Sequence, residues 1–121
     1  MAVAVGIWVG LLWSGVQGEN LHDWQSLGRA GGVEAWSTQT PDGTVRILFR
    51  NGNPHAVSIQ VARTIIWCGS DEKGTGEALD ADIGSFQLQP AESRSSPRWS
   101  RTCRKPDYYV EFRGISIESH Q

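Results

Sequence analysis

Apolar and polar residues alternate at every second position through most of this chain, and this alternation constrains the fold more than any other feature. It is typical of β-strands with one buried face, because successive side chains of a strand point to opposite sides. It is clear in three segments, at residues 33–37, 44–50 and 56–67. Turn-forming residues separate these segments, at 40–43 (Thr-Pro-Asp-Gly) and at 51–54 (Asn-Gly-Asn-Pro). We therefore expect antiparallel strands joined by short turns.

The second half of the chain continues the pattern in shorter segments. A short edge strand is expected around residues 78–79, and another strand at 86–88, ended by Pro90. The last strand begins at Tyr108, and Gly114 interrupts its alternation, so that it either continues past a kink or turns back in a tight hairpin. Strand segments that recur every 8–12 residues or so are typical of an antiparallel two-sheet sandwich. The predicted fold class is therefore all-β.

Two segments leave details of this sandwich open. The alternation breaks at residues 65–67, which indicates either a β-bulge or a stretch that is buried on both faces. Residues 93–105 are a long polar segment in which Pro97 limits ladder hydrogen bonds. The sandwich is immunoglobulin-like in its architecture only. Cys68 and Cys103 lie at expected strand ends, whereas immunoglobulin domains carry their cysteines within two facing strands.

The first 18 residues predict a cleavable signal peptide. Residues 2–16 carry no charged side chain, and an apolar run of about 15 residues is shorter than the roughly 20 that a spanning helix needs. Val16 and Gly18 are small residues at the two positions that a signal peptidase inspects, which places the mature N-terminus at Glu19. The stretch lacks Lys or Arg before its apolar core. A buried N-terminal element and an uncleaved anchor are therefore the alternatives.

The mature chain is long enough for one domain. We divide it into a lead segment at 19–32 and a β-sandwich domain at 33–121. Within the lead we expect one short helical turn around residues 21–27, which the glycines at 31–32 end. We also expect Trp24 to pack against the sandwich. No stable membrane span is expected once the signal is removed.

The two cysteines predict one intrachain disulfide, Cys68–Cys103, because an exported chain folds in an oxidising compartment. The expected location is therefore extracellular or periplasmic. Residues 71–82 carry five acids and one Lys, whereas residues 94–105 carry five bases and no acid. The disulfide would bring these segments together, and we expect them to pair with each other. The alternative is that the basic segment binds an anion, such as a sulfated glycan or a lipid headgroup.

The candidate binding residues combine cations with surface aromatic side chains, which stack on sugars and other planar groups. They are Arg98, Trp99, Arg101, Arg104 and Trp36. Trp99 lies among the arginines and is expected to be a surface aromatic, and Trp36 lies on the strand face opposite Val33 and Ala35. Trp67 follows two isoleucines and is expected in the core.

The sequence carries no catalytic or metal-binding motif. It lacks a Gly-x-Ser-x-Gly elbow, a His-Glu-x-x-His pair and a Gly-rich phosphate loop before a helix. Asp80 and Asp82 have the spacing of the start of a calcium loop, but the later ligands are missing. The three histidines are scattered, so no zinc site is expected. We therefore predict no enzyme activity, no cofactor and no metal.

The predicted function is a secreted, non-catalytic module with a binding, adhesion or structural assembly role. The formal net charge of −2 argues against nucleic acid as a ligand, since phosphate binding needs a strongly basic surface. The partner is expected to be a protein or a glycan. The alternatives are a glycan- or anion-binding module that uses the 94–105 segment and the tryptophans, and a small secreted hydrolase or enzyme inhibitor. Carboxylates for a hydrolase are available at Glu34, Asp107 and Glu111.

Overall fold

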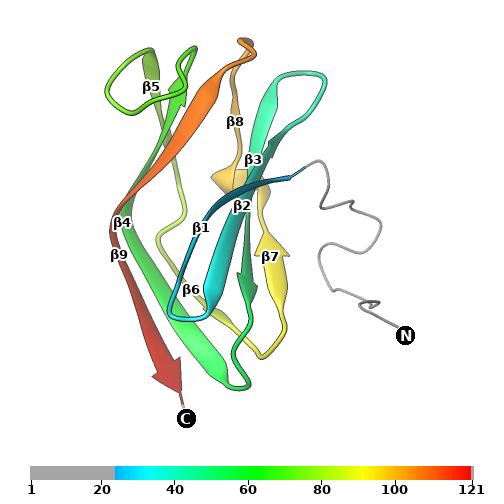
Figure 1. Ribbon diagram of the computed structural model, residues 1–121, viewed down its shortest axis with the longest axis vertical. Coiled ribbons are helices and arrows are strands. Elements are labelled where there is room, and N and C mark those ends of the chain that lie inside the picture. The colour runs from blue at the N-terminus through cyan, green and yellow to red at the C-terminus, as the bar shows by residue number, and fades with distance from the viewer. Residues whose placement is uncertain (1–23, 121) are drawn as a thin grey trace.

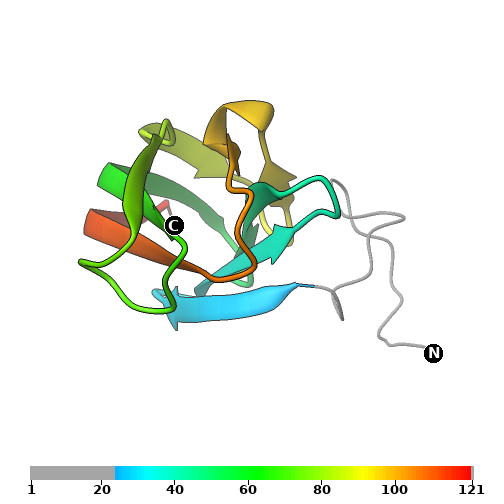
Figure 2. The ribbon, with the colours of Figure 1, turned by 90° about the horizontal axis from the view of Figure 1, so that it is seen from above.

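The computed structural model describes residues 24–120, which form two antiparallel β-sheets packed face to face (Figures 1 and 2). One sheet, called sheet I, contains β1 (Gln25–Ala30), β2 (Val33–Gln39), β3 (Thr44–Asn51), β7 (Ser93–Ser95) and β8 (Arg101–Thr102). The other, called sheet II, contains β4 (Ala56–Cys68), β5 (Glu77–Ala81), β6 (Ser85–Leu88) and β9 (Tyr108–His120). A 3-10 turn, η2 (Pro97–Trp99), joins β7 to β8. The predicted all-β class with two antiparallel sheets is confirmed.

The strand order shows how the chain passes between the sheets. In sheet I the order is β1-β2-β3-β7, and β8 also pairs with β3. In sheet II the long strand β4 pairs with β9 along its whole length, and with β6 and then β5 on the other side. The chain crosses between the sheets after β3, β6 and β8. As a result, β1 and β9 form the outer edges on one side of the sandwich (Figure 1).

The region upstream of β2 differs from its predicted structure. The predicted helical turn is wrong over residues 25–27, which belong to strand β1 and pair with β2. Residues 21–23 lie outside the described part of the chain. Gly31 and Gly32 form the β1–β2 turn with positive φ angles of 55° and 78°, which glycine adopts without strain. Sheet I therefore begins upstream of the predicted domain start at residue 33.

A cluster of aromatic rings lies at the centre of the core between the sheets. The ring of Phe49, which is 1% exposed, lies 5.2 Å from Phe86, 5.6 Å from Trp99 and 5.5 Å from Phe112, measured between ring centroids. These rings come from both sheets and from η2, so they hold the two layers together. Aliphatic side chains from the inner faces surround them, namely Val33, Val45, Ile47, Val57, Ile59, Val61, Ile66, Leu88 and Val110.

The crossing from sheet I to sheet II depends on the fully buried amide of Asn51. Its Nδ2 donates hydrogen bonds to the main-chain oxygens of His55 at 2.9 Å, Gln89 at 3.1 Å and Leu88 at 3.3 Å. Its Oδ1 accepts a hydrogen bond from the Asn53 amide at 2.9 Å. A buried polar group is costly unless it is hydrogen bonded. Here the Asn51 amide forms hydrogen bonds through both its nitrogen and its oxygen, and the main-chain groups of the turn gain a partner at the same time. The turn predicted at residues 51–54 is therefore the place where the chain passes from sheet I to sheet II.

Strands β4 and β9 share a kink. Their pairing keeps one register from Ala56 opposite His120 to Cys68 opposite Tyr108. Within it, Ala62 and Arg63 are both exposed, so the inward-facing residues of β4 change from odd to even positions there. The last strand therefore continues past a kink at Gly114, the first of the two predicted alternatives. The stretch around residues 64–66 is buried on both faces of sheet II. This is one of the two explanations predicted for the broken alternation.

We expect Gly114→Ala to destabilise the protein, because Gly114 has a φ angle of 64°. An added Cβ would also lie 2.8 Å from the Cβ of Ala62 on the paired strand. A non-glycine residue in such a conformation costs about 1–3 kcal/mol. Urea unfolding would measure the change, with Gly74→Ala as the control, because Gly74 has a similar φ of 87° and no atom within 4 Å of its added Cβ. An equal loss in both variants would show that the Ala62 contact contributes nothing.

The disulfide Cys68–Cys103 joins the two sheets at the end of the sandwich near the β2–β3 turn. Cys68 is the last residue of β4, and Cys103 directly follows β8. The amide of Cys103 donates a hydrogen bond to the Gly43 oxygen at 2.7 Å. Both cysteines are buried, 4% and 1% exposed, so the bond belongs to the core. The predicted intrachain disulfide is confirmed. No helix in residues 24–120 is long and apolar enough to cross a membrane.

Candidate binding surfaces

The predicted basic segment pairs in part with the acidic segment. Arg98 forms an ion pair with Asp82 at 2.5 Å. The guanidinium of Arg101 donates hydrogen bonds to three main-chain oxygens, those of Asp80, Arg98 and Ser100. Arg104 is exposed in the loop before β9 and makes no ion pair with another described residue. Two of the three candidate arginines are therefore engaged by their own chain, which leaves fewer guanidinium N–H donors for an anion. Anion binding by this segment stays a prediction.

The predicted exposure of Trp99 is wrong. Its side chain is only 4% exposed and packs between Phe49 and Phe86, at 5.6 and 4.8 Å between ring centroids. The cause is the turn η2, in which the Ser96 hydroxyl accepts a hydrogen bond from the Arg98 amide at 3.2 Å. A Ser before a Pro is a helix-start signal, and it could have predicted this turn from the sequence. A buried indole has no face free for a sugar.

The other candidate aromatic, Trp36, lies half-buried on the outer face of sheet I. It packs against Leu48 and Trp24 in a small cluster outside the main core. The guanidinium of Arg46 lies 5.2 Å from the Trp24 ring, within the range of a cation–π contact. Trp36 and Val33 lie on opposite faces of β2, as the sequence predicts. Trp24 packs on the sandwich, which is also as predicted. Binding through Trp36 stays a prediction.

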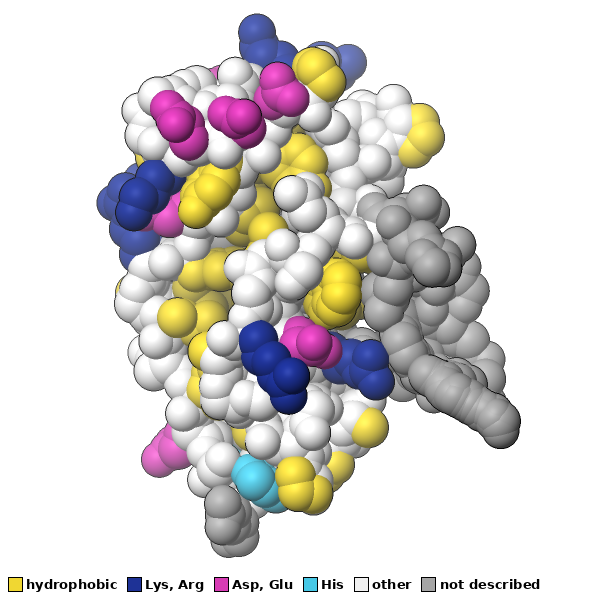
Figure 3. All heavy atoms as spheres, in the orientation of Figure 1, with side chains coloured by type: hydrophobic (Ala, Val, Ile, Leu, Met, Phe, Trp, Pro, Cys, Tyr) yellow, Lys and Arg dark blue, Asp and Glu magenta, His cyan; other side chains and the backbone are white. Residues whose placement is uncertain are grey.

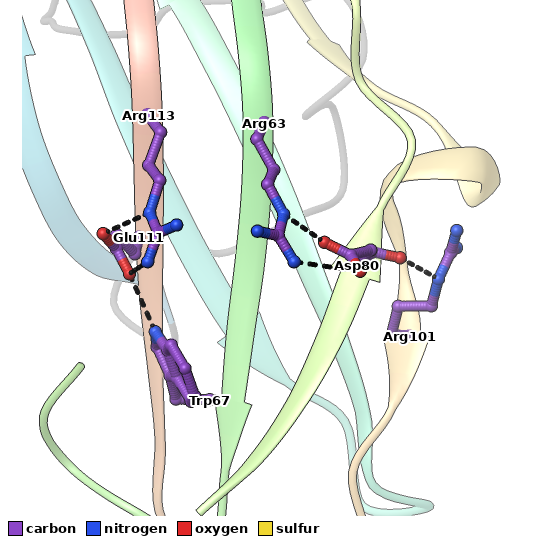
Figure 4. Close-up of polar contacts among 6 residues, drawn as sticks. All are labelled: Arg63, Trp67, Asp80, Arg101, Glu111 and Arg113. Atoms are coloured by element: carbon purple, nitrogen blue, oxygen red, sulfur yellow. Dashed lines mark hydrogen bonds and ion pairs between the residues drawn. The ribbon is translucent and has the colours of Figure 1, made fainter. Parts of the chain in front are cut away.

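The predicted core position of Trp67 is wrong, since its side chain lies half-buried on the outer face of sheet II. Its indole Nε1 donates a hydrogen bond to the carboxylate of Glu111 at 2.9 Å, and Arg113 donates to the same carboxylate at 2.9 Å (Figure 4). Beside them, Arg63 forms an ion pair with Asp80 at 2.9 Å. The change of facing at the kink in β4 is the reason that Trp67 points outward.

Hydrogen bonds lower the pKa of both carboxylates on this face. Arg63 holds the pKa of Asp80 below its ordinary value of 3.8. Arg113, followed by Trp67, lowers the pKa of Glu111 below 4.5. Both groups are therefore charged and paired at neutral pH, and neither is suited to act as a general acid. This arrangement stabilises the outer face of sheet II rather than preparing it for proton transfer.

We expect these two carboxylates to contribute to acid unfolding. A carboxyl group with a lowered pKa in the folded state adds stability above its ordinary pKa and loses it as the pH falls through the folded value. Stability should thus be flat above about pH 5 and fall at lower pH. Urea unfolding from about pH 7 to about pH 3 would measure this. The variant Arg63→Met with Arg113→Met should show a shallower fall, and an unchanged curve would contradict the assignment.

One hollow of the surface is a groove between the edge strands β1 and β9, of about 340 Å³. We call it the β1–β9 groove, and Figure 3 shows a strip of hydrophobic side chains along it. Its floor and walls are mainly apolar, formed by Leu27, Val33, Ala35, Phe49, Val110, Phe112, Ile115 and Ile117. Tyr109 and Ile115 on β9 are each 39% exposed, the only large apolar side chains in the described residues with that degree of exposure.

The two sides of the sandwich are closed differently. On the side opposite the groove, the turn η2 connects the sheets, because the Asp82 amide donates to the Arg98 oxygen at 3.3 Å and the two side chains form an ion pair. On the groove side, β1 pairs with β2 alone and β9 with β4 alone, within the described chain. Each strand therefore has a second backbone edge without a strand partner. Apolar side chains between the sheets are accessible to solvent where these edges face each other.

The hydrolase alternative stays a prediction. No group of three or more His, Cys, Asp or Glu side chains in residues 24–120 could hold a metal ion. His55 and His120 bond to Ser119 and Ser58, at 2.8 and 2.5 Å, without a carboxylate partner in the described chain. Comparison of the sequence with protein-family models, with curated proteins and with solved structures gave no match.

The groove was not among the sequence predictions. Its residues were recognised as strand residues, but the meeting of β1 with β9 depends on the strand order of both sheets. One signal was available in the sequence. Ile115 and Ile117 extend the apolar alternation after Gly114, in a last strand with nothing predicted to cover it.

Proposed function

We propose that this protein is a non-catalytic, protein-binding module whose contact surface is the β1–β9 groove. The observation that carries the proposal is the coincidence of an apolar groove with two strand edges that have no strand partner among residues 24–120. Exposed apolar patches of this kind mark interaction sites in soluble proteins. Long unpaired edges are liabilities that proteins usually cover or blunt, and a bound partner covers both features at once.

An extracellular or periplasmic location fits this role. The apolar residues 1–18, proposed as a cleavable signal peptide, would direct export, and the Cys68–Cys103 disulfide would form in the oxidising compartment. A small domain with an open side has a reduced core, and a covalent link between its sheets offsets part of that loss. The proposal includes adhesion and subunit assembly as the kinds of work that such a module does.

The strand order also supports an immunoglobulin-like arrangement as part of the proposal. Strands β7 and β8 lie beside β3, and β9 lies beside β4, although each pair is distant in the sequence. In immunoglobulin domains strand E likewise lies beside B, and F beside C, while a further strand G covers the free edge of F. By this analogy of fold, β9 takes the place of strand F, and the place of strand G is the edge that faces the groove.

Selection from a display library of short random peptides would test the function. The immobilised wild-type protein would select binders, and Ile115→Glu would serve for comparison, because it places a carboxylate at an exposed site in the groove. We expect selected peptides to bind wild type and to lose roughly tenfold or more in affinity for the variant. The charge-matched control is Gln60→Glu, on the exposed outer face of sheet II. Equal binding to all three proteins would contradict the proposal.

A further inference from the structure

We infer that the β1–β9 groove receives an extended strand of a partner protein, which pairs with the free edge of β9 and inserts alternate apolar side chains between the sheets. This inference rests on the proposed function and names the partner's chemistry: apolar side chains at every second position, with acidic residues at the ends. Strand addition of this kind uses main-chain hydrogen bonds for affinity and side-chain pockets for specificity.

The backbone of β9 is suited to strand addition. The strand is 13 residues long, and its pairing with β4 uses one edge only. In an antiparallel pair, every second residue directs its N–H and C=O groups away from its partner. In β9 these groups face the groove side, where no described strand pairs with them. An added strand would complete the hydrogen bonding of this edge.

The side chains beside this edge favour a strand over a compact ligand. Val110 and Phe112 precede the kink at Gly114, and Ile115 and Ile117 follow it, so apolar groups line the groove along most of β9. Leu27 of β1 lies across from them. A strand laid between β1 and β9 would place every second side chain against this row, because its side chains alternate between two faces. A helix would present its apolar groups at a different spacing.

The charges around the groove favour acidic residues in the partner. Arg29 of β1 and Lys73 line the groove, and neither forms an ion pair with another described residue. The single acid of the lining, Glu111, is already bonded to Arg113 and Trp67. Among the lining side chains the two cations therefore outnumber the acids, and the acid nearest to Arg29 in register is Glu34 on β2. Opposite charges on a partner raise specificity and the association rate more than affinity itself.

The probe is a synthetic peptide in which valine and threonine alternate between terminal glutamates. Binding would be measured by titration, and amide hydrogen exchange of the full chain would be recorded with and without the peptide. We expect alternate amides of β9 to become protected, since only every second N–H faces the added strand. The variant Ile115→Glu should weaken binding roughly tenfold or more, and Gln60→Glu should leave it unchanged.

Two N-methylated forms of the peptide test the backbone pairing directly. One form carries the methyl groups on the valine amides and the other on the threonine amides, so that the side chains stay the same. Amides of alternate residues point to opposite edges of a strand. Strand addition therefore predicts that one form loses binding and the other keeps it. Equal affinity of both forms would overturn strand addition, because docking through side chains alone does not distinguish them.

Charge reversal tests the acidic ends. Arg29→Glu should weaken binding of the glutamate-ended peptide and strengthen binding of a lysine-ended one. If the variant does not change the preference in this way, the charge assignment is wrong.

Binding that depends on Ile115 without protection of β9 overturns strand addition and leaves the proposed function standing. Failure of the peptide to bind at millimolar concentration overturns the inference, whereas failure of the library selection overturns the function. Protection of β9 that grows with protein concentration alone would identify a second copy as the occupant, and would also overturn the inference.

Discussion

Replacing Cys68 and Cys103 together with alanine is expected to lower the free energy of unfolding by about 4 kcal/mol. The two residues are 35 positions apart, and closing a loop of that length removes roughly this much conformational free energy from the unfolded chain. The loss is large against the roughly 5–15 kcal/mol by which most domains are stable. Urea unfolding of the variant beside the oxidised wild type would measure it.

Reduction of the wild-type protein provides the control for this experiment. Both sulfur atoms are buried, so alanine also removes packing, whereas reduction opens the bond and keeps the sulfur atoms. We expect reduction to produce most of the loss, and the alanine variant to lose somewhat more. A change below about 1 kcal/mol on reduction would show that the unfolded chain gains little freedom, and would contradict the loop-closure explanation.

Much of the fold could be predicted from the sequence, because alternation is a local signal and strand pairing follows it. The strands around residues 33–37, 44–50 and 56–67 were found in this way, with nearly their observed bounds. Strands β7 and β8 are two that this signal does not reveal. β7 and β8 contain three and two residues, too few to show an alternation, and they form only because β3 offers them an edge.

The facing of the tryptophans shows where local reasoning fails. Trp99 follows a polar run and is surrounded by arginines, yet the turn that begins at Pro97 directs it into the core. Trp67 follows two isoleucines, yet the kink at Ala62 turns it outward. In both cases one backbone irregularity reverses the side to which the following residue points. A strand period of two makes each such shift decisive.

The candidate site was harder to predict than the fold, for a topological reason. A groove needs two edges that face each other, and the sequence indicates strands without indicating which of them end a sheet. Residues 25–30 show no clear alternation in the sequence, so it does not indicate that β1 forms an edge of sheet I. The charge segregation, by contrast, was legible in the sequence. In the structure, the acidic and basic segments neutralise each other in part through the Arg98–Asp82 ion pair, which lies on the side of the sandwich opposite the groove.

The core beneath the groove makes a second large effect predictable: Phe49→Ala should lower the free energy of unfolding by about 3–5 kcal/mol. Phe49 is 1% exposed, contacts three other rings and also lies at the floor of the groove. Truncation removes buried apolar surface and leaves a cavity that the surrounding rings fill only in part. Urea unfolding would measure the loss, and Phe49→Leu, which keeps more of the volume, should cost roughly 1–2 kcal/mol.

A matched control separates the packing of the floor from the groove itself. Tyr109→Ala removes an aromatic side chain of similar size from the rim, where it is 39% exposed, and should cost much less stability than Phe49→Ala. Buried and exposed aromatics differ in this way because only the buried ring leaves a cavity. If both variants lost equal stability, the ring cluster around Phe49 would not be the centre of the core. The residues at the rim of the groove would then contribute as much to folding stability as the buried rings do. The groove would be part of the folding core rather than a binding surface for a partner.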